Sequence, residues 1–153
     1  MSVRRSVLIA AVLCALPVLG APQVQAYPPS EGSGGCRQGG LMTGRLVPGT
    51  GSAGQNIRRT AKLRECVSSL LPGIGSGQFD VTIPWNAPDT PSSAQFAWSD
   101  GSISPATGYG NGLWLITDGP ARGHAIQVIV ADTWNGWYYS FADVAVTSAI
   151  FQS

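Results

Sequence analysis

The chain has little charge and almost no histidine, and both shortages restrict its chemistry. Of 153 residues only 11% are Asp, Glu, Lys or Arg, and His124 is the one histidine. A serine triad or a histidine-based metal site would depend on that single imidazole, and no G-x-S-x-G nucleophile motif is present. The net charge of the chain is +1, so no excess of basic residues points to nucleic acid as a partner.

Long apolar runs are also missing, apart from one near the N-terminus. Residues Ser6 to Leu19 form an apolar run of 14 residues after Arg4 and Arg5, and Val24-Gln25-Ala26 offers small residues at a cleavage site. The run is shorter than the roughly 20 residues that a helix needs to cross a bilayer. Residues 1–26 therefore predict a signal peptide, a secreted protein and no membrane attachment after its removal.

Cysteine is scarce as well, with three residues in the chain. Cys14 lies in the predicted signal peptide, which leaves Cys36 and Cys66 in a compartment where thiols are oxidised. We expect these two residues to form a disulfide that closes a loop of about 30 residues. A metal-binding or catalytic cysteine pair would need a further ligand or a base nearby in the sequence, and neither is present.

The rest of the chain is a series of short apolar or alternating segments separated by turn residues. This pattern predicts an all-β fold, an antiparallel β-sandwich or barrel, in a single domain over residues 41–153 that follows a flexible leader over 27–40. The segment 55–71 fits both a helical stripe and strand alternation; we favour a strand there and keep one short helix as the alternative. Strands are expected near residues 41–47, 77–84, 93–98, 112–117, 123–134 and 137–150.

Two turn sequences predict hairpins. Asn135-Gly136 is a strong two-residue turn signal, because both positions accept positive φ and alternating apolar residues flank them. A turn there would pair Val130 with Phe141. The second turn, Ser99-Asp100-Gly101-Ser102, is soon followed by Pro105, which we expect to end its second strand.

Four short motifs carry a resemblance. They are Gly35-Cys36, residues 63–69 (LRECVSS), residues 72–77 (PGIGSG) and residues 98–102 (WSDGS). In these motifs the chain resembles small secreted two-cysteine proteins of high-GC Gram-positive bacteria. The resemblance implies a β-rich fold and no particular activity.

Candidate catalytic groups are few. A secreted hydrolase would use His124 with Asp132 or Asp143, two carboxylates that fall on the predicted core face. Residues 49–54 match the spacing of dinucleotide-binding glycines, but no acidic residue follows about 20 positions on and no second βαβ unit is present. We therefore favour a non-catalytic protein without a cofactor or a metal ion.

Aromatic residues are the most suggestive candidates for binding. Trp and Tyr rings stack on sugar faces and are enriched at binding surfaces, although small β-domains also use them in the core. The candidate ligand-binding residues are Trp114, Trp134, Trp137 and Tyr138.

A basic segment offers a second candidate. Arg58, Arg59, Lys62 and Arg64 could grip an anionic polymer such as a cell-wall phosphate chain, or they could form a solvated face without a ligand. We predict a binding module for polysaccharide or the cell surface. The alternative partner is another secreted protein, bound or inhibited through residues 86–92 and 104–112.

Overall fold

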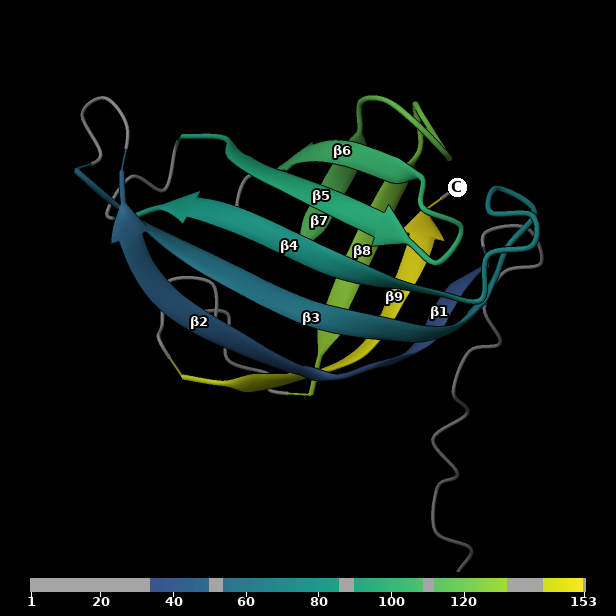
Figure 1. The fold of residues 1–153 in the computed structure, drawn as a ribbon, viewed down its shortest axis with the longest axis horizontal. Coiled ribbons are helices and arrows are strands. Elements are labelled where there is room, and N and C mark those ends of the chain that lie inside the picture. The colour runs from purple at the N-terminus through teal and green to yellow at the C-terminus, as the bar shows by residue number, and fades with distance from the viewer. Residues whose placement is uncertain (1–33, 50–53, 86–89, 109–111, 132–141, 153) are drawn as a thin grey trace, which may run out of the picture.

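The chain forms a closed barrel of antiparallel strands (Figure 1). The computed structural model describes residues 34–49, 54–85, 90–108, 112–131 and 142–152. Every regular element among them is a strand, which confirms the predicted all-β class. The strands are β1 (Gly35–Gly39), β2 (Leu41–Pro48), β3 (Gln55–Val67), β4 (Ser76–Pro84), β5 (Ser92–Trp98), β6 (Ile103–Gly108), β7 (Leu113–Ile116), β8 (Ala125–Val130) and β9 (Val144–Gln152).

The strands follow one another around the barrel in sequence order. Each strand from β2 to β8 pairs with the next, and β9 returns to pair with β2, which closes the ring of described strands. The extra strand β1 continues the line of β2 and also lies between β3 and β9. Gly40 joins the two, because its N–H donates to Lys62 O (2.7 Å) and its carbonyl accepts from Val146 N (3.0 Å).

The segment 55–71 contains the long strand β3, so the helix alternative is wrong. Ile57, Ala61 and Leu63 point into the barrel and are buried, as strand alternation requires. Val67, which a helical stripe would have buried, is 66% exposed. The alternation shifts at Glu65, whose positive φ of 51° lets both Leu63 and Cys66 face inward.

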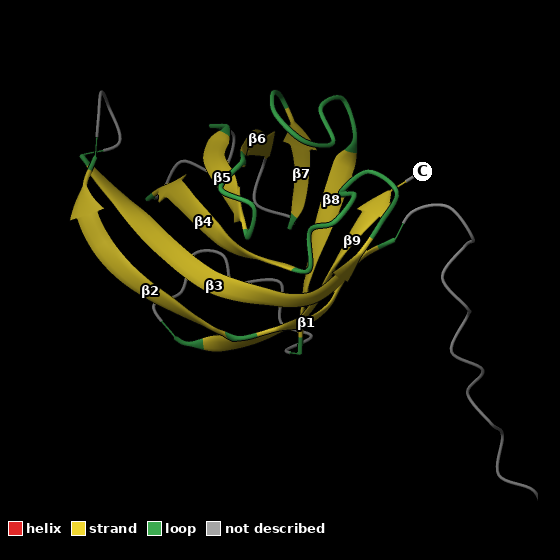
Figure 2. Ribbon diagram, turned by 45° about the vertical axis from the view of Figure 1, so that its right-hand side comes forward, coloured by secondary structure: helices red, strands yellow, loops and turns green. Residues whose placement is uncertain are grey.

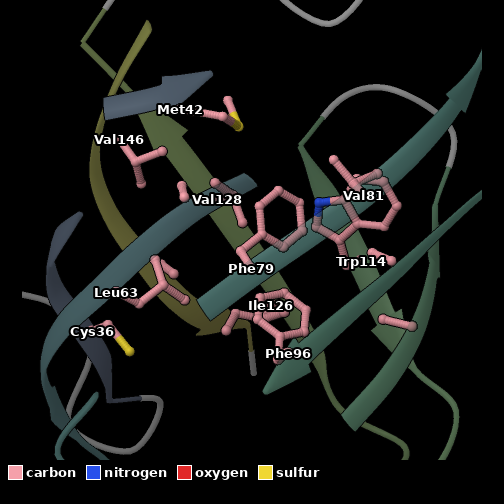
Figure 3. Packing of buried hydrophobic residues seen from close by; sticks show 14 of the residues in the cluster. Cys36, Met42, Leu63, Phe79, Val81, Phe96, Trp114, Ile126, Val128 and Val146 are labelled. Atoms are coloured by element: carbon pink, nitrogen blue, oxygen red, sulfur yellow. The ribbon is translucent and has the colours of Figure 1, made fainter. Parts of the chain in front are cut away.

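Aromatic rings fill the middle of the barrel (Figure 3). The ring centroids of Phe79 lie 5.1 Å from Phe96 and 5.5 Å from Trp114, and Phe96 stacks on Trp98 at 5.6 Å. An eight-stranded barrel is just wide enough for side chains to fill it. These contacts make the interior a packed core in the described part of the chain.

The predicted disulfide is confirmed. Cys36 of β1 and Cys66 of β3 are directly opposed across the two strands, their sulfurs are bonded at 2.04 Å, and both are buried. Because β1 spans Gly35–Gly39, the end of the expected leader over 27–40 is a strand and not a flexible segment.

The two ends of the barrel differ in their connections. At the end near the disulfide, the connections 68–75, 99–102 and 117–124 are described throughout. At the other end, the four connections between strands include residues outside the described part of the chain: 50–53, 86–89, 109–111 and 132–141. The predicted turn at Asn135-Gly136 falls among these residues.

Two expectations about strand pairing are wrong. Val130 pairs with Val146 and not with Phe141, because β9 begins only at Val144 and an irregularity between Ile129 and Val130 shifts the register. The second arm of the turn at 99–102 does not end at Pro105. It continues as β6 to Gly108, and Pro105 stays in the ladder by accepting a hydrogen bond from Thr117 N at 2.8 Å.

Candidate functional site

The predicted aromatic site is only partly within the described residues. Trp114 lies on β7 with its ring in the core and no exposed surface, so its prediction as a ligand-binding residue is wrong. The inward alternation of β7 causes this, because Trp114 and Ile116 both face the barrel axis. Trp134, Trp137 and Tyr138 lie outside the described residues, and their role stays a prediction.

The two described residues of the hydrolase alternative, His124 and Asp143, are not brought together. His124 is exposed in the connection before β8, at the disulfide end, whereas Asp143 precedes β9 at the opposite end. Asp143 is exposed and not on the core face, and Asp132 lies outside the described residues. A base and its orienting carboxylate need hydrogen-bond contact, which this separation prevents for His124 and Asp143.

Two other carboxylates, Asp100 and Asp118, bind backbone N–H groups within turns. Asp100 accepts from the Ser102 N–H at 2.9 Å, and Asp118 accepts from the Gly119 N–H at 2.9 Å. Within the described ranges no group of three His, Cys, Asp or Glu residues could hold a metal ion. The glycine-rich segment 49–54 leads into strand β3, whereas a dinucleotide site needs a helix there.

Of the residues proposed for protein binding, some lie in a strand and others lie outside the described residues. Residues 104–108 belong to β6, and their side chains alternate between the core and the exterior. Residues 86–89 and 109–111 lie outside the described part of the chain.

The basic segment divides between the two sides of the barrel wall. Arg58, Lys62 and Arg64 point outward from β3, but Arg59 points inward and has no exposed surface. The predicted cluster of four is therefore wrong for Arg59. Alternation with Ile57, Ala61 and Leu63 was the sequence signal that separates it from its neighbours.

A backbone hydrogen bond and the space beside a glycine accommodate Arg59 inside the barrel. Its Nη1 donates to Ala142 O at 3.2 Å, and its guanidinium fills the position beside Gly44, where a Cβ would lie 3.2 Å from Arg59 Cζ. Burial lowers the pKa of Arg59, and the negative charge of Asp143 opposes that shift. Arg59 is thus an interior residue and no part of an exposed binding surface.

A fourth cation joins the outward side chains from the neighbouring strand. Arg45 of β2 is directly opposite Arg58 in the ladder, and it is exposed. The sequence did not identify it, because the pairing register of β2 with β3 could not be deduced from the isolated segment. We use the term cationic face for the outward side chains of Arg45, Arg58, Lys62 and Arg64.

One member of the cationic face is neutralised. Arg58 makes a two-pronged contact with Asp80 of β4, with Nε to Oδ1 at 3.0 Å and Nη2 to Oδ2 at 2.7 Å. The hydrogen bond and the charge of Asp80 both raise the pKa of Arg58. Among the described residues, Arg45, Lys62 and Arg64 form no ion pair.

The cationic face is regular and shallow. Alternate residues of a strand lie about 6.6 Å apart, so the cations from Arg58 to Arg64 extend over about 20 Å. A shallow groove of about 290 Å³ follows this part of the sheet, and Thr43, Thr60 and Gln78 line it beside Lys62 and Arg64. Hydroxyl and amide groups therefore lie beside the cations on an open surface.

The comparisons with known proteins add no relative. No protein-family model, no curated protein and no solved structure matches this chain. In the described ranges we also find no apolar helix of membrane-spanning length.

Proposed function

We propose that the protein is a secreted, non-catalytic binding domain that holds an anionic extracellular polymer on its cationic face. The observation that carries the proposal is the set of three outward cations, Arg45, Lys62 and Arg64, without an acidic partner among the described residues. Their positive charge is concentrated on one face of a chain whose net charge is only +1. Such a local field attracts polyanions that the protein as a whole would not attract.

The shape of the face favours a polymer over a small molecule. Small-molecule sites are concave pockets that cover most of their ligand, whereas the groove beside Lys62 is shallow and open along the strand. An extended chain with a negative charge on each repeat can contact several cations in turn. Arginine binds phosphate and carboxylate groups with two parallel hydrogen bonds, so polyol phosphates and acidic polysaccharides both fit.

Two features support an extracellular setting. Residues 1–26 have the pattern of a signal peptide. The disulfide between Cys36 and Cys66 belongs to a class of bond that persists in oxidising compartments and is rare in the cytosol. Both fit a protein that meets cell-wall or capsular polymers outside the membrane.

Titration calorimetry with a soluble polyol phosphate, a polyuronate and neutral dextran tests the proposal. We expect binding to one or both anionic polymers, no binding to dextran, and an affinity that falls as salt screens the charges. Lys62→Ala and Arg64→Ala should each weaken binding about twofold to fivefold, the range of exposed ion pairs. The matched control is Arg122→Ala, which removes an exposed cation from the connection before β8 and should leave the affinity unchanged.

Two results would contradict the proposal. One is equal affinity of the Lys62→Ala/Arg64→Ala double variant and the wild type for the anionic polymers. The other is equal binding of dextran and the anionic polymers, which would assign recognition to sugar rings alone. In that case the predicted stacking residues Trp134, Trp137 and Tyr138 would become the primary site, and tryptophan fluorescence would change on titration.

A further inference from the structure

Charge is distributed very unevenly around the barrel. No residue of β5, β6, β7, β8 or β9 is Asp, Glu, Lys or Arg, whereas β1–β4 hold all the charged residues found in described strands. The exterior of these five strands therefore presents no charged side chain. Depletion of charge is the compositional mark of interface cores.

The uncharged exterior also carries exposed aliphatic side chains. Ile103 of β6, Leu115 of β7 and Ile129 of β8 are 47%, 49% and 42% exposed. Leu115 sits at the centre, opposite Thr107 on one side and Ala125 on the other. We use the term neutral wall for the outward side chains of β5–β9.

The neutral wall lies across the barrel from the cationic face. In the closed ring of β2 to β9, β7 is four strands from β3 in both directions. Figure 2 shows β2 and β3 at the lower left and β7 and β8 at the upper right of the barrel. A partner on the neutral wall would therefore leave the cationic face uncovered.

We propose that the neutral wall is a self-association surface, on which a second copy of this chain packs face to face about a two-fold axis. A two-fold contact places the same patch against itself, so a charged patch would repel its mate, while an uncharged patch with a central leucine does not. The net charge is +1, or −1 without Arg4 and Arg5 of the predicted signal peptide, and so adds little repulsion between copies at longer range. Self-association therefore needs no complementary partner.

The size of the neutral wall sets the strength of the dimer. Five strands spaced about 4.8 Å apart and about six residues long cover roughly 20 Å by 20 Å. That footprint is smaller than the roughly 800 Å² that each partner buries in a standard stable interface. We expect a dissociable dimer, with a dissociation constant on the order of 10 to 100 μM.

The dimer would be bivalent. With the neutral walls in contact, the two cationic faces point in opposite directions, so one dimer contacts two segments of polymer. This consequence rests on the proposed function, but the dimer itself does not. Two-site attachment raises apparent affinity without new contacts, because the second binding step is intramolecular.

Sedimentation equilibrium of the purified protein without polymer tests the dimer from about 1 to 200 μM, a range that brackets the expected constant. The wild type should pass from monomer to dimer, and the equilibrium should be insensitive to salt, unlike polymer binding. Leu115→Lys should weaken association about a hundredfold, because the two-fold axis brings the two lysines together. The control Val67→Lys adds the same charge at an exposed position on β3 and should dimerise as the wild type does.

Mixing two variants tests the two-fold arrangement. Leu115→Lys and Leu115→Glu should each be monomeric alone, and an equimolar mixture should restore association through the opposite charges. A wild type that remains monomeric over the whole range would overturn the proposal. So would a Leu115→Lys variant that dimerises as strongly as Val67→Lys, because the contact would then lie elsewhere.

Discussion

Replacement of Cys36 and Cys66 by alanine should lower the free energy of unfolding by an amount that follows from the size of the loop closed by the disulfide. The two residues are 30 positions apart, and closing a loop of that size removes about 12 cal/mol/K of entropy from the unfolded chain. At 25 °C this amounts to about 3.6 kcal/mol of free energy of unfolding. Both side chains are buried, so the smaller alanines add a packing loss of about 1 kcal/mol. For a domain whose stability is about 5–15 kcal/mol, the variant should be marginally folded.

Urea unfolding followed by tryptophan fluorescence measures this loss. With a urea dependence of about 1–3 kcal/mol/M, the midpoint of the double variant should fall by about 1.5–5 M. Reduced wild-type protein separates the two contributions, because it loses the closed loop but keeps both sulfur atoms in the core. The control Val67→Ala changes an exposed neighbour of Cys66 and should keep the wild-type midpoint. A midpoint shift below about 0.3 M on reduction would refute the reasoning, since the loop would then restrict the unfolded chain very little.

Two further substitutions test the described structure. Gly77→Ala should lower the free energy of unfolding by about 1–3 kcal/mol, because its Cβ would lie 2.6 Å from the Trp98 ring. The control is Gly75→Ala, whose Cβ would meet nothing within 4 Å. Equal thermal midpoints of the two variants would contradict this packing. The Ser102 hydroxyl and N–H hold the pKa of Asp100 below its ordinary value, so this carboxylate contributes stability above pH 3.8 that is lost as pH falls through the lowered pKa. Asp100→Asn should flatten the acid limb of the stability profile, and an unchanged limb would show that the turn does not favour the ionised form.

Alternation and cysteine arithmetic predicted much of the fold. The inward positions of β3 and β4 were readable because apolar side chains recur at every second residue, as at Ile57 and Phe79. The pairing of Cys36 with Cys66 followed from there being no other cysteine outside the predicted signal peptide. Alternation is a local pattern along one strand, and the number of cysteines is read directly from the sequence, so neither prediction depended on which strands pair.

The errors concern features that only the closed barrel decides. Strand β1 has almost nothing apolar, and its position comes from pairing on both sides with β3 and β9. Trp114 looked like a surface ring until the direction of β7 was known. The cationic face combines Arg45 with Arg58 through a register that sequence separation alone does not reveal. In each case the deciding contact is with another strand.

Closure of the ring has a consequence for the order of folding. Leu41 pairs with Ala145, so the seam between β2 and β9 joins residues 104 positions apart and cannot form until the last strand has been synthesised. Until then β2 and β8 are both unpaired edges, which invite association with other chains. The disulfide links β1 to β3, strands near the start of the chain, and can form before the seam does. A chain that stops before Val144 would therefore contain a disulfide-bonded N-terminal sheet with two unpaired edges, and we expect it to aggregate.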